Sequence, residues 1–216
     1  MIEDISIDRG ESFYLFRFPY PFRKYSSAPY GGGTGHSTGY LNRTVPSDYK
    51  CDPVTDIDEF LMKNGMNYTG LTATLTACRV ENAIIERKES STPPLMVSVT
   101  GGSSNALSIG SKGFSSQGTI NIAVISDAHM DDASALNLFM AITESKSQAM
   151  NDLGIKDRTT GKAAPGTSTD TVSLFLSGNG PRYRYGGRLT DIGRETSMMV
   201  YSAVKASLIS DCTGWK

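Results

Sequence analysis

The segment Gly118–Asp170 constrains the fold most, because it contains a strand, a long helix and a second strand in succession. Apolar β-branched residues alternate with Asn and Ala across Ile120–Val124, which is typical of a strand with at least one buried face. A helix is predicted over Ala133–Leu153. After a loop rich in Gly, Pro and Thr, a second strand is predicted within Gly166–Leu176.

The predicted helix carries polar residues where a core-facing stripe is expected. At about 100° per residue, one side collects five apolar residues: Leu136, Phe139, Met140, Met150 and Leu153. Thr143, Lys146 and Ser147 fall within that same arc, and Glu144 lies at its edge. Buried polar groups cost stability unless they are paired. Either Lys146 extends past the core to water, or the middle of the helix lines a pocket and Lys146 has a carboxylate or carbonyl partner.

The composition excludes several classes of protein. The chain has 216 residues and a formal net charge of −1, so we expect binding to neither nucleic acid nor an anionic membrane. The first ten residues lack the apolar stretch of a signal peptide, and no apolar run approaches the ~18 residues of a membrane-spanning helix. Cys51, Cys78 and Cys212 are odd in number and scattered, which indicates reduced thiols in a cytoplasmic protein.

The rest of the chain predicts shorter elements. Phe13–Phe18 is typical of a strand, and Pro19–Tyr40, with its glycine cluster, of a loop in which the backbone can approach a ligand closely. A short helix is expected over Asp56–Lys63 and a long one over Asp191–Ile209. Three short β-like runs suggest an antiparallel meander: Leu71–Ala77, Ala83–Arg87 and Leu95–Thr100.

Together these elements predict an α/β or α+β fold, in which a mixed, largely antiparallel sheet is covered by two long helices as a sandwich. Nothing in the composition requires more than one domain at this length, so residues 1–216 are expected to form a single domain. Residues 1–25 are expected as an N-terminal extension strand, and residues 210–216 as a loose tail.

Three predicted strand ends run into polar loops, Thr100–Asn105, Asp127–His129 and Thr167–Asp170. If these strands share a sheet, the loops converge on one cleft, the usual place for a site in α/β proteins. Amide hydrolysis there would need an activated water or nucleophile, donors for the oxyanion and an acid for the leaving amine. The Thr-Ser-Thr-Asp sequence is also a good turn or helix cap, so a purely structural role stays open.

The candidate catalytic residues follow from these needs. Asp170 or Glu144 could activate water, and Lys146 could act as a base or stabilise the oxyanion. The backbone N–H groups of Gly101 and Gly102 could also hold an oxyanion. The candidate substrate-binding residues are Gly32, Gly33, Asn42, Thr100, Gly101, Gly102, Asn105, Asn121, Thr167, Ser168 and Thr169.

Metal ligands are scarce in this chain. Histidine occurs only at His36 and His129, and Asp127 and Asp131 lie close to the second of these. This spacing is not that of a metalloprotease helix, and capping by Asp131 accounts for part of it. We therefore predict no metal site.

Seven stretches carry a resemblance to a known family: SSAPYGGG (26–33), NRTVPSDY (42–49), GLTATLTA (70–77), VSVTGGSSNALSIG (97–110), GTINIAVISDAHMDDASALNLFMAITESKSQAMNDLGI (118–155), GTSTDTV (166–172) and YGGRLTDIGRETSMMVYSAVKASL (185–208). Together and in this order, they resemble the adenosylcobinamide amidohydrolases over nearly the whole chain. There are small departures. Ser145 and Ser147 flank Lys146 where the family tends to have Ala, and Ser168 stands where Gly is usual.

The resemblance implies hydrolysis of the aminopropanol arm of adenosylcobinamide to adenosylcobyric acid, a salvage step in cobalamin synthesis. The partner is then a small corrinoid substrate. Because this substrate contains its own cobalt, the protein is expected to need no cofactor. The alternative is a corrinoid-binding module without hydrolysis, in which His36 or His129 would be the lower cobalt ligand. The sequence leaves the oligomeric state open, a homo-oligomer included.

Overall fold

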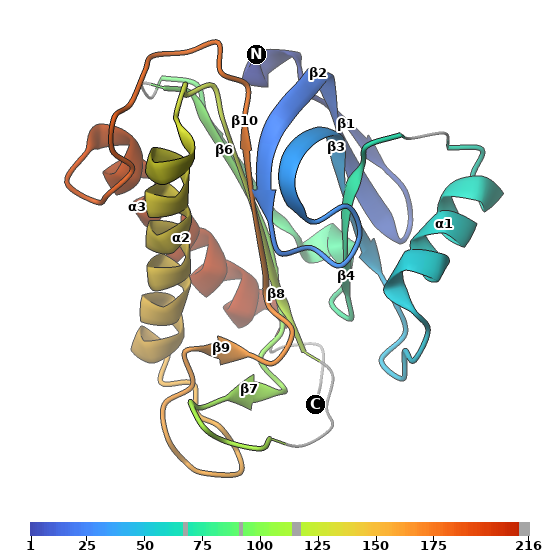
Figure 1. The fold of residues 1–216 in the computed structure, drawn as a ribbon. Coiled ribbons are helices and arrows are strands. Elements are labelled where there is room, and N and C mark those ends of the chain that lie inside the picture. The colour runs from blue at the N-terminus through green and yellow to red at the C-terminus, as the bar shows by residue number, and fades with distance from the viewer. Residues whose placement is uncertain (67–68, 91–92, 114–117, 212–216) are drawn as a thin grey trace.

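Eight strands form one sheet in the order β4-β3-β2-β10-β8-β6-β5, with β1 paired to β2 (Figure 1). The strands are β1 (Ser6–Arg9), β2 (Phe13–Ser26), β3 (Gly33–Thr44), β4 (Thr72–Thr76), β5 (Ile84–Lys88), β6 (Leu95–Gly101), β8 (Ile120–Ser126) and β10 (Thr171–Leu176). The pairs β8–β10 and β3–β4 are parallel, and the other pairs are antiparallel. This computed structural model describes residues 1–66, 69–90, 93–113 and 118–211, and it confirms the predicted fold class.

The smaller elements complete the chain. Strands β7 (Ala106–Leu107) and β9 (Gly166–Thr167) form a separate antiparallel pair. Two short 3₁₀ helices, η1 (Ile2–Asp4) and η2 (Val80–Asn82), precede β1 and β5. The α-helices are α1 (Pro53–Lys63), α2 (Asp132–Asp152) and α3 (Asp191–Asp211).

Helix α2 connects β8 to the parallel strand β10, so the predicted strand–helix–strand unit is confirmed. Parallel strands require such a crossover, because a tight turn cannot reverse the chain direction twice. Asp131 caps the helix, since its Oδ1 accepts a hydrogen bond from Ser134 N at 2.8 Å. Gly154 follows the last turn with φ +66°, a conformation that glycine adopts without strain.

The buried face of α2 is rotated from the predicted one. Leu136 is 51% exposed and Met140 is 59% exposed, so the prediction is wrong for both, whereas Leu138 and Ile142 are fully buried. Much of the buried face consists of Ala and Ser, which allow close packing against the sheet and α3. Large apolar residues therefore do not mark this face.

The sheet curls, so that its two halves enclose an aromatic core. Tyr14 Oη on β2 lies 2.7 Å from Ser98 Oγ on β6, and Asn121 on β8 donates from Nδ2 to the Leu75 carbonyl on β4 at 2.8 Å. Neither pair of strands is adjacent in the sheet. Ring side chains fill the enclosed space: Phe16, Phe18, Phe22, Tyr40 and Phe175.

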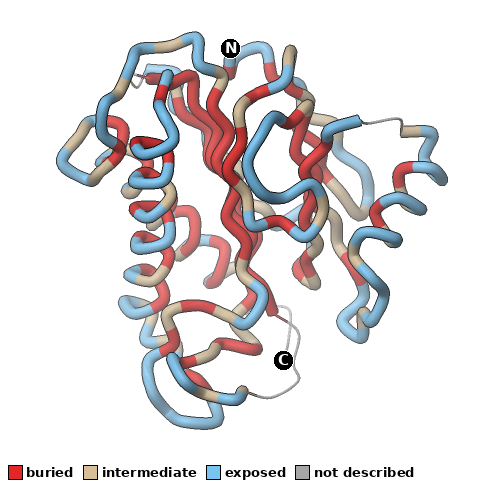
Figure 2. The backbone as a smooth tube through the Cα atoms, viewed as in Figure 1, coloured by how far each residue is buried: buried red, intermediate tan, exposed pale blue. Residues whose placement is uncertain are grey.

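Helices cover the outer faces of both halves. The apolar sides of α2 and α3 pack on the outward residues of β6, β8 and β10, such as Val99, Ile122 and Leu174. Helix α1 packs its Ile57 against Leu41 of β3. Figure 2 shows the central strands buried while the helices expose their outer sides to solvent. The predicted sandwich with two long helices is thus confirmed, and α1 adds a shorter helix on the other half.

Most of the predicted loop Pro19–Tyr40 is strand, so that prediction is wrong. Strand β2 runs on to Ser26, and β3 begins at Gly33. Pro19 falls at an irregularity in the β2–β3 pairing, where its missing N–H is tolerated. Residues 13–25, expected as an N-terminal extension, belong to β2, which lies between β3 and β10.

The predicted meander is wrong for its first strand. Strand β4 pairs in parallel with β3 at one edge of the sheet, whereas β5 lies at the other edge. Only β5 and β6 of the three runs form an antiparallel pair.

Helix α1 begins at Pro53 rather than Asp56, because Asp52 accepts a hydrogen bond from Thr55 N at 2.9 Å and caps the helix there.

The end of the chain is helical further than expected. Helix α3 continues to Asp211, and the rest of the predicted loose tail, 212–216, lies outside the described residues. Cys51 and Cys78 are free thiols, whereas Cys212 falls in that undescribed stretch. The part of the chain that the structure describes contains no helix long and apolar enough to cross a membrane.

Candidate active site

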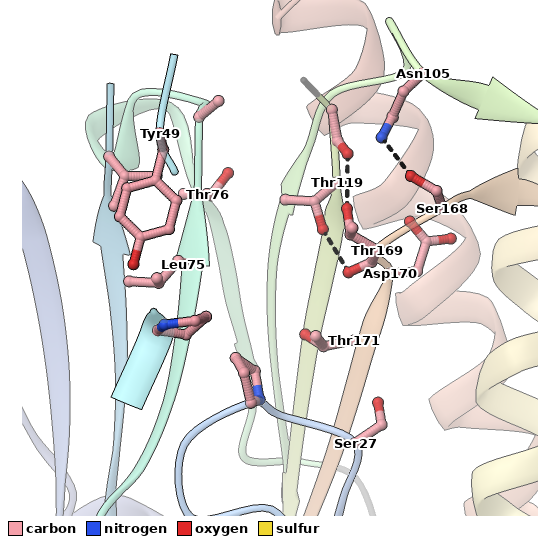
Figure 3. A pocket seen from close by; sticks show the side chains of 15 residues that line it. Ser27, Tyr49, Leu75, Thr76, Asn105, Thr119, Ser168, Thr169, Asp170 and Thr171 are labelled. Carbon is pink, nitrogen blue, oxygen red and sulfur yellow. Dashed lines mark hydrogen bonds between the residues drawn. The ribbon is translucent and has the colours of Figure 1, made fainter. Parts of the chain in front are cut away.

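A cavity of about 520 Å³ lies at the end of the sheet where β8 and β10 begin (Figure 3). One wall is polar and is formed mainly by Asn105, Thr119, Ser168, Thr169, Asp170 and Thr171. The facing wall is largely apolar and is formed mainly by Pro29, Val45, Tyr49, Pro53 and Leu75. This volume is within the ~300–1,000 Å³ of small-molecule sites. The two walls suit a ligand that carries both hydrocarbon and neutral polar groups.

Asp170 organises the polar wall. Its Oδ1 accepts hydrogen bonds from Ile120 N at 3.0 Å and from the Thr167 hydroxyl. Its Oδ2 accepts from Thr167 N at 3.0 Å and from Lys146 Nζ. A carboxylate has about four lone-pair sites, and these four donors occupy them. Asp170 therefore holds the loop that precedes β10, which is the structural role left open for the Thr-Ser-Thr-Asp sequence. It also lines the cavity.

Lys146 reaches Asp170 from the buried side of α2. The two side chains form an ion pair in which each is 10% exposed, so the predicted carboxylate partner of Lys146 is confirmed. Lys146 itself does not line the cavity and contacts the site through Asp170. A Cβ atom at Gly166 would lie 2.4 Å from both Lys146 Nζ and Asp170 Oδ2. A side chain at this position would therefore displace at least one of the two charged groups.

The other polar residues of the helix midpoint lie away from the cavity, so that part of the prediction is wrong. Glu144 is exposed and forms a surface ion pair with Arg188 at 3.2 Å. The Thr143 and Ser147 hydroxyls donate to carbonyls of their own helix at 3.2 Å and 3.0 Å, as such residues commonly do. The rotation of α2 that exposes Leu136 also carries these side chains outward.

The Thr100–Asn105 segment contributes Asn105 to the cavity, but not the predicted oxyanion donors. The Gly102 N–H donates to the Thr119 carbonyl at 2.9 Å and is therefore occupied. Gly101 is buried against Ser207 and Leu208 of α3, on the side of the sheet that the helices cover.

Three predicted substrate-binding residues form a buried network instead of lining the cavity. Asn42 donates from Nδ2 to Thr100 Oγ1 at 2.8 Å and to Tyr14 Oη at 2.9 Å. Thr171, which does line the cavity, donates to Asn121 Oδ1 at 2.9 Å. Asn42, Thr100 and Asn121 are at most 1% exposed. They join β3, β6 and β8 inside the curl of the sheet.

The glycine turn between β2 and β3 lies beside the cavity rather than in it. Gly32 and Gly33 are exposed and are not lining residues, although Ser27 and Pro29 of the same turn are. Gly33 has φ +83°, so the turn itself requires glycine.

The Asp127–His129 loop lies at the wrong end of the sheet for the predicted convergence. Strand β6 is antiparallel to β8, so Gly101 at the end of β6 pairs with Ile120 at the start of β8. The loop that follows β8 is therefore at the opposite end. Neither His36 nor His129 lines the cavity. Within the described ranges, no group of three or more His, Cys, Asp or Glu side chains is placed to hold a metal ion.

The apolar wall was not predicted from the sequence. Val45 and Tyr49 belong to the NRTVPSDY stretch, and Pro53 begins α1 shortly after it. Burial, reinforced by the nearby Asp56 carboxylate, raises the pKa of Tyr49 to about 12, so this phenol stays neutral near pH 7. The resemblance of that stretch to the family was the available signal, because isolated apolar residues in a loop show no periodicity.

Asp157 ties the loop between α2 and β9 to Ser108, the residue that follows β7. Its buried carboxylate accepts hydrogen bonds from Ser108 N at 3.0 Å, Ser108 Oγ at 2.8 Å and Thr159 N at 2.8 Å. These donors, with the Ser108 N–H the strongest, hold the pKa of Asp157 far below its ordinary value.

We expect Asp157→Asn to destabilise the protein at neutral pH and to matter less in acid. A carboxyl whose pKa is lowered by folding stabilises the native state above its unfolded pKa of ~3.9. That contribution is lost as the pH falls toward the folded pKa. Urea unfolding at several pH values should therefore show a difference between variant and parent that is constant above about pH 5 and shrinks below about pH 4. A difference independent of pH would point to lost packing instead.

Known proteins match this chain over the elements that form the cavity. A family model described as adenosylcobinamide amidohydrolase matches residues 1–213. The adenosylcobinamide amidohydrolase of Halobacterium salinarum is 27% identical over an alignment of length 201 that covers 88% of this chain and 82% of that protein. An uncharacterised protein of Methanocaldococcus jannaschii is 33% identical over 93 residues, which are 43% of this chain and 34% of that protein. Since the family match spans β8, α2 and β10 together with both walls of the cavity, the chain belongs to the adenosylcobinamide amidohydrolase family.

Proposed function

We propose that this protein hydrolyses the amide that joins the aminopropanol arm to adenosylcobinamide, releasing adenosylcobyric acid and aminopropanol. The observation that carries the proposal is the cavity at the start of β8 and β10. There, the GTINI and GTSTD stretches meet around Asp170. Its polar wall offers mainly neutral hydroxyl and amide groups to the amides of a corrinoid, and its apolar wall offers surface for hydrocarbon.

In this reaction, water forms a bond to the amide carbonyl carbon, and the carbon–nitrogen bond then breaks. Asp170 is the one carboxylate among the lining residues of the described chain. We assign it to take a proton from water and to return a proton to the leaving nitrogen. A lone pair becomes free when the Thr167 hydroxyl turns away from Oδ1, because a hydroxyl rotates whereas the two backbone N–H donors are fixed.

Lys146 acts through Asp170 in this scheme. Its ammonium group contacts Oδ2 from behind the cavity wall, which fixes the orientation of Oδ1. Glu144 has no part, because its carboxylate is exposed and paired with Arg188.

The alternative of a corrinoid-binding module without hydrolysis has less support. It needs a lower ligand for cobalt, and neither histidine lines the cavity. The Lys146–Asp170 ion pair holds its loop in either case, but only hydrolysis gives the Asp170 carboxylate a chemical role.

Incubation of the purified protein with adenosylcobinamide tests the proposal. Mass spectrometry should detect adenosylcobyric acid and free aminopropanol in equal amounts, and prior treatment with EDTA should leave the rate unchanged. Binding of the corrinoid without either product would support the binding module instead. Loss of the rate with EDTA, restored by a divalent metal, would overturn the expectation that the protein needs no metal.

A further inference from the structure

Ser168 and Asn105 meet on the polar wall from two separate loops. Asn105, which follows β6, donates from Nδ2 to Ser168 Oγ at 2.9 Å (Figure 3). Asn105 is only 6% exposed, whereas Ser168 is exposed in the cavity. The pairing of β7 with β9 brings the two loops together, because Ala106 lies opposite Thr167.

The oxygen of the Asn105 side-chain amide lacks a hydrogen bond among the described residues. This Oδ1 atom is buried. An unpaired buried acceptor destabilises the folded state, so a group that persists in this state calls for an explanation. We infer that the fold tolerates the unpaired Oδ1 because this orientation of the amide lets Nδ2 donate to Ser168 Oγ.

Gly118 provides the space for this arrangement. A Cβ atom there would lie 2.4 Å from Asn105 Oδ1 and 3.0 Å from the Gly102 carbonyl oxygen. Any larger residue would push the amide away from its position. Gly118 thus lets Asn105 point its Nδ2 at Ser168.

The Ser168 hydroxyl keeps its hydrogen available for a ligand. Oγ accepts from Asn105, and among the described residues no acceptor is bonded to the hydroxyl hydrogen. A serine hydroxyl has one donor and two lone pairs, so this one keeps its donor for a ligand in the cavity. The adjacent lining groups are themselves neutral, apart from Asp170.

We propose that Ser168, aimed by Asn105, donates a hydrogen bond to a carbonyl oxygen of one of the substrate's amide groups. Ser168 is then a specificity-determining residue of this chain, and Asn105 is its positioning residue. The proposal rests on the proposed function for the identity of the ligand. Because the bond is made to the bound substrate and not only in the transition state, it lowers KM without changing kcat.

A double-mutant cycle tests the pair. Ser168→Ala should raise the KM for adenosylcobinamide about fivefold with kcat unchanged, as expected for one neutral hydrogen bond. Asn105→Leu, which keeps the volume, should raise KM by a similar factor. The double variant should be no worse than either single variant, because Asn105 acts through Ser168. Ser168→Thr keeps the hydroxyl and should keep most of the affinity.

Two outcomes would overturn the proposal. In one, Ser168→Ala leaves KM unchanged. In the other, Asn105→Leu raises KM equally with Ser168 present or replaced, which is the result of a merely structural role. Ser103→Ala, in the same loop as Asn105 but outside the cavity lining, controls for general disturbance. If the parent protein releases no aminopropanol, the proposed function fails. The same cycle measured as corrinoid Kd would still decide the role of Ser168.

Discussion

Asp170→Asn should lower the turnover of adenosylcobinamide by about 10²-fold or more, and should also lower the free energy of unfolding by about 3–5 kcal/mol. The loss of turnover follows from removing the one carboxylate among the described lining residues. The loss of stability follows because Lys146, 10% exposed, would be left as an unpaired cation. Single-turnover assays and urea unfolding measure the two effects separately.

A second variant separates catalysis from stability. Lys146→Met combined with Asp170→Asn removes both charges at nearly constant volume. Replacing a buried ion pair as a unit is often close to neutral for stability, so this double variant should unfold much later than Asp170→Asn alone. Its turnover should stay low. If the double variant recovers the parent's turnover per folded molecule, the pair is structural and Asp170 is not the base.

Gly166→Ala should lower turnover by a similar factor of about 10², although the substitution adds only a methyl group. The φ of Gly166 is not in the left-handed region, so alanine is compatible with its backbone. The new Cβ would, however, lie 2.4 Å from both charged atoms of the Lys146–Asp170 pair. Asp170 is held by backbone donors at Ile120 and Thr167, so Lys146 is displaced and the carboxylate loses its cation.

Gly187→Ala is the matched control. A Cβ at Gly187 would meet only the exposed end of the Asn137 side chain, at 3.2 Å, so turnover and stability should change little. Steady-state kinetics and thermal unfolding of both alanine variants make the comparison. Parent-like turnover in Gly166→Ala would show that the close contact of Lys146 with Asp170 is not needed for catalysis.

Local patterns of apolar residues in the sequence predicted much of the fold. The alternation in Ile120–Val124 predicted β8, and the apolar spacing of Asp191–Ile209 predicted α3, whose Ile192, Val200 and Val204 are fully buried. Such signals depend only on neighbours along the chain, so they are readable without the tertiary structure. The partner of Lys146 was predictable for a related reason, since a buried cation requires a counter-charge wherever the chain supplies it.

The sequence by itself therefore determined the strand–helix–strand unit, the fold class and the polar loop around Asp170. Only the tertiary structure decided which face of α2 is buried, which strand β4 joins, and which residues form the apolar wall. These choices depend on contacts between segments far apart in the chain. Strand pairing and helix rotation are set by the packing that the whole sheet allows. Glu144 illustrates the difference: its place on the helix was readable from the sequence, but its distance from the cavity follows from the rotation of α2 against the sheet and α3.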